Sequence, residues 1–178
     1  MTSLLKTLLE AKMTYDENVI KALYDYEFGY TTDINYRFHT SSATSTDIKE
    51  ASKISSVMKS QKLPVLYRAT SWEYMQKWFG VYRDCLDVWI GKIFVDKGFV
   101  STSLDPRVPM DFYPNNSETV YFTIKSKKAV KAVNINDVLG KASPSPSDKE
   151  VLLDRNTKFK ILSCDVKNNI YHIDLEII

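Results

Sequence analysis

Two carboxylates lie one residue apart in this chain, where a polar stretch gives way to an apolar one. Asp148 and Glu150 follow a serine- and proline-rich segment at 141–147 and precede the apolar residues 151–153. If a strand has begun by Asp148, its two-residue period puts both acids on one face and Lys149 on the other. Such a pair could act at a catalytic sheet edge, and a charged surface loop entering a strand would look the same.

An arginine and a serine interrupt two other apolar runs. Arg68 lies near the end of a strand-like run at 63–70, where a cation needs a carboxylate or an anionic ligand to be stable. Ser101 opens the hydroxyl-rich triplet that closes a second strand-like run at 98–103. A structural ion pair and an ordinary turn would explain each residue taken alone. The order of these residues along the chain, arginine then serine then glutamate, makes them informative together.

The composition indicates one globular domain. The chain has 178 residues, which is enough for a single domain with its own core. Its 24 basic and 22 acidic residues leave a net charge of +2, which gives no argument for binding to nucleic acid or to a membrane. We expect a monomer in which residues 1–62 form a helical N-terminal part and residues 63–178 a mainly β core.

The cysteines and histidines do not have the spacing of a metal site. Cys85 and Cys164 lie far apart, and His39 and His172 are the only histidines. We therefore expect free thiols in a reducing compartment and no bound metal. No stretch approaches the roughly 20 apolar residues of a membrane span, and charged residues such as Lys6 interrupt any signal-like run, so we expect a cytoplasmic protein.

Helical periodicity dominates the first third of the chain and strand-like patterns dominate the rest. Because the strands are separated by turns rather than by regular crossover helices, antiparallel pairing and the α+β class are favoured. The predicted helices cover 4–9, 19–28, 31–38 and 47–60, and the predicted strands cover 63–70, 93–95, 98–103, 119–126, 129–133, 150–153, 158–166 and 170–178.

Taken together, four segments resemble the motifs of the Arg-Ser-Glu clade of ADP-ribosyltransferases. Residues 66–69, 97–104 and 148–160 are similar to its three motifs, and residues 30–38 to the helix before the first motif. The resemblance extends over residues 16–178. It implies an α+β fold in which N-terminal helices pack on two facing antiparallel sheets, with NAD in the cleft between them.

The resemblance implies a role for each matched residue. Arg68 would hold the phosphates and a ribose of NAD, Ser101 would orient the catalytic acid, and Glu150 would be that acid. Asp148 would face the acceptor, and the loop at 141–147 would meet the target protein. The further NAD neighbours that the resemblance implies are Ala69, Thr102, Ser103, Tyr30, Asn35 and either Phe112 or Tyr113.

These residue types suit the implied chemistry. Nicotinamide leaves with its bonding electrons, so positive charge develops on the ribose, and an ionised Glu150 would stabilise that charge. The planar guanidinium of Arg68 suits a pyrophosphate. The sequence has no GxGxxG motif and no P-loop, so NAD is expected as a consumed substrate rather than as a hydride carrier on a Rossmann unit.

A host protein is the expected acceptor of ADP-ribose. Arginine-modifying members of the family usually have glutamate at the position of Asp148, and asparagine-modifying members have glutamine. Asp148 keeps the negative charge on a side chain one methylene shorter, so we predict an arginine acceptor. The resemblance and the lack of a secretion or receptor-binding region favour a phage-encoded enzyme or an injected effector that acts in the host cytoplasm.

Other functions stay open at this stage. A plain NAD glycohydrolase would use water as the acceptor, and a non-catalytic NAD-binding or interaction module could keep the same fold. A glycoside hydrolase is disfavoured because Asp148 and Glu150 are too close in sequence to flank a sugar bond from opposite sides.

Overall fold

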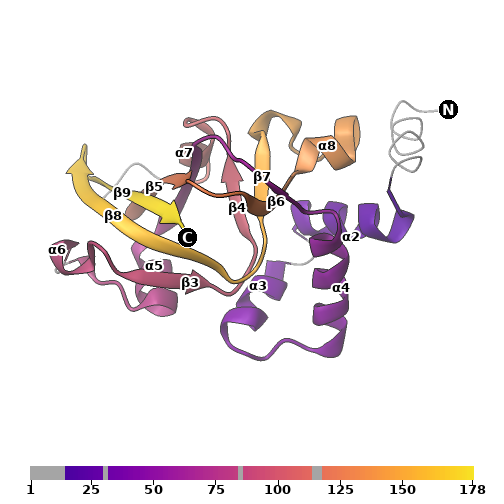
Figure 1. Ribbon diagram of the computed structural model, residues 1–178, viewed down its shortest axis with the longest axis horizontal. Helices are drawn as coiled ribbons and strands as arrows, with labels where there is room; N and C mark the ends of the chain where they lie inside the picture. Colours follow the sequence, from indigo (N-terminus) through magenta and orange to yellow (C-terminus); the bar gives the residue numbers. More distant parts are fainter. Residues whose placement is uncertain (1–14, 30–31, 84–85, 114–117) are drawn as a thin grey trace.

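The computed structural model describes residues 15–29, 32–83, 86–113 and 118–178, which form helices around a large β-sheet (Figure 1). The helices are α2 (Glu17–Glu27), α3 (Thr32–His39), α4 (Ser45–Ser56), α5 (Trp72–Phe79), α6 (Leu86–Trp89), α7 (Val108–Asp111) and α8 (Ile135–Leu139), with 3₁₀ turns η2 (Gly140–Ala142) and η3 (Pro146–Asp148). The strands are β1 (Lys59–Gln61), β2 (Leu66–Ser71), β3 (Ile93–Asp96), β4 (Val100–Ser103), β5 (Thr119–Ser126), β6 (Val130–Asn134), β7 (Glu150–Leu153), β8 (Thr157–Lys167) and β9 (Ile170–Ile177). The predicted α+β class is confirmed.

The strands of the described residues form one hydrogen-bonded sheet in the order β1-β6-β7-β4-β2-β5-β9-β8-β3. Strands β5 and β9 are parallel, and the other neighbouring pairs are antiparallel. Between β2 and β4 the only registered pair is Tyr67 with Ser103. The expected detail of two facing antiparallel sheets is therefore corrected to two half-sheets that remain joined at this seam. The parallel pair arises because β9 follows β5 only after a long connection through β6, β7 and β8, which allows both strands to run the same way.

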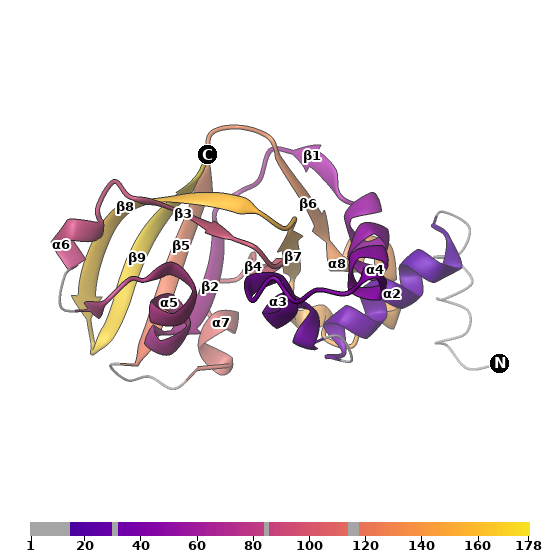
Figure 2. The ribbon, with the colours of Figure 1, turned by 90° about the horizontal axis from the view of Figure 1, so that it is seen from below.

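The two half-sheets share one hydrophobic core. Val100 and Leu153, from β4 and β7, belong to the same buried cluster as Phe122 and Leu175, from β5 and β9. The view in Figure 2 shows the half-sheet with β6, β7 and β4 set at an angle to the half-sheet with β5, β9 and β8. The seam between β2 and β4 lies at this bend, next to the shared core.

Helices α2, α3, α4 and α8 gather beside the half-sheet that contains β6 and β7 (Figure 2). Leu23 of α2, Ile54 of α4 and Leu139 of α8 form a second core cluster with Leu152 of β7 and with Phe99, which directly precedes β4. Strand β7 is thus buried on both faces, which explains the unbroken apolar run after Glu150.

Local side-chain contacts fix where these helices begin. The side chain of Asp16 accepts a hydrogen bond from the main-chain N–H of Asn18 at 2.8 Å and caps α2. Thr44 and Asp47 form a capping box at the start of α4. Asp47 also pairs with Arg37 of α3, with 2.6 Å between its Oδ1 and the arginine Nη2, so α3 and α4 are held together.

The predicted elements differ from the observed ones mainly where the sequence is polar. The helix predicted to reach Ser60 ends at Ser56, and Lys59–Gln61 instead form β1, whose three side chains are all exposed and show no strand period. Helices α7 and α8 are too short to give a periodic signal. A tight turn at Asn168 and Asn169, which have φ values of 52° and 62°, joins β8 to β9.

Two further expectations concern the ends and the location of the chain. The helix predicted at 4–9 lies outside the described residues. Within the described ranges, no helix combines the length and apolar character needed to cross a bilayer.

Candidate active site

A cavity of about 580 Å³ opens where β2, β4 and the start of β7 meet the ends of α2 and α7. Eight of the residues predicted for the site line this cavity: Arg68, Ala69, Ser101, Thr102, Ser103, Phe112, Asp148 and Glu150. The other residues along its wall are Tyr26, Glu27, Tyr67, Val108, Pro109, Tyr113 and Ser145. The fold therefore brings the three polar interruptions of the sequence to one place.

Arg68 and Ser101 are joined across the seam between the half-sheets. Nη1 of Arg68 donates a hydrogen bond to the main-chain oxygen of Ser101 at 2.8 Å, which uses one of the five guanidinium N–H groups. Cζ of Arg68 lies 5.7 Å from the centroid of the Tyr74 ring, and the ring face stabilises the cation. The arginine is thereby fixed in the cavity wall.

Glu150 begins β7 and has an unusual protonation equilibrium. Burial raises the pKa of Glu150 to about 7, and the charges of Glu27 and Asp148 add to the rise. The interaction with the Ser101 side chain and the charge of Arg68 lower the pKa of Glu150, and they partly offset the effect of burial. The pKa of this carboxyl therefore lies well above the usual glutamate range, and such shifts are common for groups in functional sites.

Asp148 and Glu150 both reach the cavity, but strand alternation is not the reason. The strand begins only at Glu150, whereas Asp148 ends the 3₁₀ turn η3. Between them, Lys149 has a left-handed backbone with φ 48° and ψ 45°. Its Nζ lies 3.4 Å from Oδ2 of Asp105. The left-handed residue turns the chain so that the two acids share the cavity and the lysine points to Asp105.

The segment that carries Asp148 is held by three hydrogen bonds to two other parts of the chain, α2 and α8. Oε1 of Glu27 accepts hydrogen bonds from the hydroxyl of Ser143 at 2.5 Å and from the main-chain N–H of Ser145 at 3.3 Å. The side-chain amide of Asn136 donates to the main-chain oxygen of Pro146 at 3.0 Å. These bonds give residues 143–148 a defined position beside the cavity.

The hydroxyls of Thr102 and Ser103 are engaged with the main chain. Thr102 Oγ1 donates to the oxygen of Val151 at 2.5 Å, and Ser103 Oγ donates to the oxygen of Asp148 at 2.6 Å. Ser103 Oγ also accepts a hydrogen bond from the N–H of Asp105 at 2.9 Å. These contacts connect β4 to both ends of the acidic turn.

Tyr26 and Glu27 are among the cavity residues that were missed from the sequence. Tyr26 and Glu27 lie at the end of α2, where they read as ordinary positions of an amphipathic helix. Burial raises the pKa of Tyr26 to about 12, so its hydroxyl stays protonated. Burial also raises the pKa of Glu27, although its bonds to Ser143 and Ser145 oppose the shift. No local sequence signal distinguishes these residues.

Asn35 does not line the cavity. Its Nδ2 donates to the main-chain oxygen of Phe99 at 3.1 Å and to the hydroxyl of Tyr26 at 3.0 Å, and its Oδ1 accepts from the N–H of Phe99 at 2.8 Å. The structure therefore places this predicted NAD neighbour behind the wall, against the chain that enters β4. Tyr30, also predicted for the site, lies outside the described residues.

The aromatic residues after β4 both face the cavity. Phe112, which is 66% exposed, and Tyr113 are part of its wall. Phe112 and Tyr113 therefore both remain candidates for the aromatic residue that stacks on the ligand.

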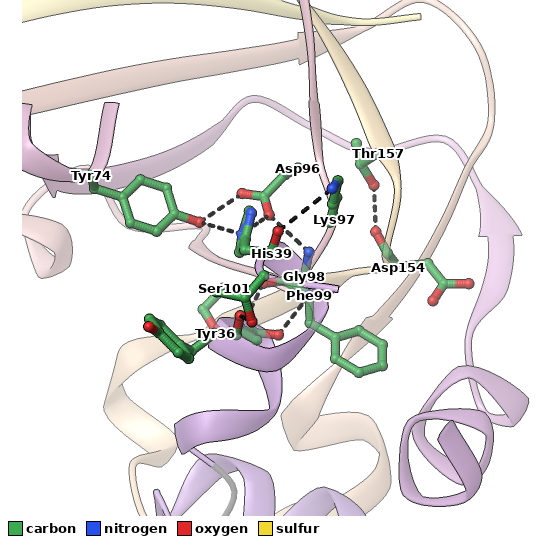
Figure 3. A network of polar contacts seen from close by, with 12 residues as sticks. Tyr36, His39, Tyr74, Asp96, Lys97, Gly98, Phe99, Ser101, Asp154 and Thr157 are labelled. Atoms are coloured by element: carbon green, nitrogen blue, oxygen red, sulfur yellow. Dashed lines mark hydrogen bonds and ion pairs between the residues drawn. The ribbon is translucent and has the colours of Figure 1, made fainter. Parts of the chain in front are cut away.

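Figure 3 shows a buried polar cluster that contains Tyr74, the residue whose ring lies beside the guanidinium of Arg68. The Tyr74 hydroxyl donates to Oδ2 of Asp96 at 3.0 Å, and Oδ1 of Asp96 lies 3.0 Å from Nε2 of His39. Oδ1 of Asp96 also accepts from the N–H of Gly98 at 3.0 Å. The cluster fixes Tyr74 under the guanidinium of Arg68 and fixes the turn into β4.

The cavity combines one fixed cation with three carboxyl groups and with aromatic side chains. Arg68 suits an anionic group, whereas Glu27, Asp148 and Glu150 suit a cationic or developing positive centre. Aromatic rings beside them suit a planar group. Among the described residues, no cluster of three histidine, cysteine or carboxylate side chains could hold a metal ion.

Several solved structures are similar in fold. Plx2a, an ADP-ribosyltransferase toxin from Paenibacillus larvae, has a TM-score of 0.76 and 18% identity over 97% of this chain and 92% of its own. C3stau2 from S. aureus, solved with NAD, has a TM-score of 0.73 and 16% identity over 99% and 91%. The ADP-ribosyltransferase Vis, a Vibrio splendidus toxin solved in complex with agmatine, has a TM-score of 0.64 and 20% identity over 100% and 87%.

Sequence comparison gives a second, independent result. No curated protein matches the chain significantly. The family model for the ADP-ribosyltransferase exoenzyme matches residues 6–176, which is nearly the whole sequence. The chain therefore belongs to the ADP-ribosyltransferase exoenzyme family.

Proposed function

We propose that the chain is a mono-ADP-ribosyltransferase that consumes NAD and transfers ADP-ribose to a side chain of a host protein. The observation that carries the proposal is the meeting of Arg68, Ser101 and Glu150, from three separate strands, in one cavity. Family membership and the NAD-bound structure of the similar C3stau2 support it.

The reaction assigns a task to each of the three residues. The bond between the ribose C1′ and the nicotinamide nitrogen breaks, its electrons leave with nicotinamide, and a nitrogen of the acceptor bonds to C1′ and loses a proton. Ionised Glu150 stabilises the positive charge on the ribose, and Arg68 holds the phosphates. Ser101 fixes the orientation of Glu150 through the hydrogen bond between them.

The remaining predicted residues shape the NAD site. Ala69 is buried and leaves room in the wall beside Arg68. Thr102 and Ser103 hold β4 to the acidic turn. Phe112 or Tyr113 stacks on the nicotinamide ring. NAD acts here as a substrate, and the reaction uses no metal.

We propose arginine as the acceptor side chain. Asp148 lines the same cavity as Glu150 and carries a charge that suits a guanidinium. The similar Vis protein binds agmatine, which contains a guanidinium group. Residues 144, 146 and 147 beside Asp148 are exposed, so this segment can meet a target protein.

Incubation with NAD labelled in its adenosine half tests the proposal. The expected result is labelled protein in a host lysate, labelled agmatine when agmatine is the only acceptor, and no labelling with Glu150→Gln. Free ADP-ribose as the only product would identify an NAD glycohydrolase instead. No NAD consumption by a folded protein would identify a binding module and overturn the proposal.

A labelled protein band without labelled agmatine would retain the transferase and reject arginine. Mass spectrometry of that band would then identify the acceptor side chain. Folding of Glu150→Gln is checked by its thermal unfolding, so that a loss of labelling reports on chemistry.

A further inference from the structure

A chain of polar contacts runs from the backbone before β4 to the carboxyl of Glu150. It begins at Asn35, passes through the hydroxyls of Tyr26 and Ser101, and ends at Glu150. The segments involved are α2, α3, β4 and β7, which come from distant parts of the sequence. The direction of each hydrogen bond follows from the one before it.

The first step is the orientation of the Asn35 amide. The main-chain N–H of Phe99 can only donate, and it lies 2.8 Å from Oδ1 of Asn35. The main-chain oxygen of Phe99 can only accept, and it lies 3.1 Å from Nδ2. A reversed amide would place its NH₂ group against the N–H of Phe99 and its oxygen against the main-chain oxygen of Phe99, and neither contact is a hydrogen bond. The backbone of Phe99 therefore fixes which end of the Asn35 amide faces Tyr26.

The second step is the direction of the Tyr26 hydroxyl. Nδ2 of Asn35 donates to the hydroxyl oxygen of Tyr26 at 3.0 Å. The single hydrogen of Tyr26 is then left for another acceptor, and Oγ of Ser101 lies 3.4 Å away. This separation is longer than an ordinary O–H···O bond, and catalytic hydrogen bonds of ligand-free enzymes commonly shorten when substrate binds.

The third step is the direction of the Ser101 hydroxyl. If Oγ of Ser101 accepts from Tyr26, its own hydrogen is free to donate to the carboxylate of Glu150. Ser101 pairs with Leu152 between β4 and β7, so Glu150, two residues earlier on β7, lies on the same face of the sheet, and both side chains line the cavity. Each donor in the chain then points toward Glu150. A hydroxyl that donates stabilises the ionised carboxylate, which is the form that the proposed reaction needs.

Gly98 makes room for the start of this chain. A Cβ at Gly98 would lie 2.8 Å from both Cγ and Oδ1 of Asn35, which is closer than side chains approach one another. The N–H of Gly98 is in turn held by Oδ1 of Asp96 at 3.0 Å, and this part of the network is visible in Figure 3. A glycine at this position lets α3 bring the Asn35 amide against the backbone of Phe99.

We propose that Tyr26 and Asn35 are positioning residues that set the direction of the Ser101 hydroxyl, so that it donates to Glu150. Tyr26 acts through its hydroxyl, and its ring packs edge-on against Phe99 at a centroid distance of 5.5 Å. The consequence for activity rests on the proposed function, whereas the consequence for the ionisation of Glu150 does not.

The test is Tyr26→Phe, which removes the hydroxyl and keeps the ring. The expected result is a rise in the pKa of Glu150 by roughly half a unit or more, measured by carboxyl NMR in protein labelled at glutamate, with the Glu150 signal assigned by Glu150→Gln. In the activity assay, the acid limb of kcat/KM moves to higher pH and kcat at pH 6 falls about 3- to 10-fold, with KM for NAD within about twofold. Tyr24→Phe, two residues earlier on α2 and outside the cavity wall, is the matched control and leaves both readouts unchanged.

Gly98→Ala approaches the same chain from its other end. It pushes the Asn35 amide away from Phe99 and is expected to raise the pKa of Glu150 in the same direction. If Tyr26→Phe leaves the Glu150 pKa at its wild-type value while Ser101→Ala raises it, the relay is overturned. If no variant or wild-type protein cleaves NAD but the NMR shift appears, the relay stands and the proposed function fails.

Discussion

The guanidinium of Arg68 is bonded to the main-chain oxygen of Ser101, at 2.8 Å, across the seam where β2 and β4 share a single registered residue pair. The cation therefore helps to hold the half-sheets together in addition to facing the cavity. A lysine has one compact ammonium group and cannot make this bond while presenting a planar fork to a pyrophosphate.

We expect Arg68→Lys to weaken NAD binding by at least about 10-fold, because the bidentate phosphate contact is lost. Isothermal titration with NAD measures the change. Arg83→Lys is the control, because Arg83 pairs with Glu118 and does not line the cavity. Equal affinities of Arg68→Lys and wild type would remove Arg68 from the phosphate site.

Glu150→Gln is expected to abolish transfer and to stabilise the fold at alkaline pH. The pKa of Glu150 rises from 4.5 to about 7 on folding, so the native state binds more protons than the unfolded state between these values. The contribution of this group to stability is full below pH 4.5 and is lost as pH rises through 7, a loss of up to about 3 kcal/mol. Thermal unfolding should therefore show a higher Tm for Glu150→Gln at pH 8, and the difference should vanish near pH 4.5.

The same ionisation predicts the pH dependence of NAD cleavage. Because the reaction needs the carboxylate, kcat/KM of the wild type should fall as pH decreases below about 7. An acid limb near the ordinary glutamate pKa would show that Glu150 is not the group that titrates.

Asp148→Ala should reduce transfer to protein more than it reduces NAD hydrolysis. Asp148 shares the cavity with Glu150 but lies in the preceding turn, on the proposed acceptor side. We expect transfer to fall at least about 10-fold, as for loss of a charge-assisted contact, with hydrolysis within a few-fold of wild type. Asp148→Asn separates the charge from the size of the side chain. Equal loss of both activities would reject this division between the acids.

Glu27→Gln should move the acid limb of NAD cleavage to lower pH. The charge of Glu27 contributes to the raised pKa of Glu150, and glutamine removes that charge while keeping an oxygen for Ser143 and Ser145. Kinetic profiles from pH 5 to 9 measure the shift. Asp25→Asn removes a charge from the same helix, where Asp25 pairs with Lys21, and should leave the profile unchanged.

Glu27→Ala distinguishes the electrostatic effect from the structural one. It removes the charge and also both bonds to residues 143–145, so transfer should fall further than hydrolysis. A wild-type ratio of the two activities would show that Glu27 does not position the acceptor-side segment.

The residues that sequence reasoning located share one property. Arg68, Ser101 and Glu150 are polar side chains that interrupt or border apolar strand-like runs, and such interruptions are visible in a single sequence. The strands themselves were also predictable, since β5 and β7 occupy the predicted bounds.

The features that it missed depend on contacts between distant residues or on an unusual backbone conformation. Glu27 reaches the cavity because it bonds to Ser143 and Ser145, which are 116 and 118 positions away in the chain. Lys149 adopts a left-handed backbone conformation. An asparagine or a glycine at this position would have indicated such a conformation, but a lysine does not. Asn35 was placed in the NAD site by resemblance, whereas its amide is used by Phe99 and Tyr26.

Ser103 takes part in both the seam and the acidic turn. Its main chain pairs with Tyr67 on one side and Glu150 on the other, and its hydroxyl holds the main chain of Asp148. The strand pair with a single registered residue pair, β2 and β4, therefore also contains the residue that positions both acids. Because Arg68 lies on β2 and both acids are attached to β4 through Ser103, any change in the angle between the two half-sheets would also change the distance from the arginine to the acids.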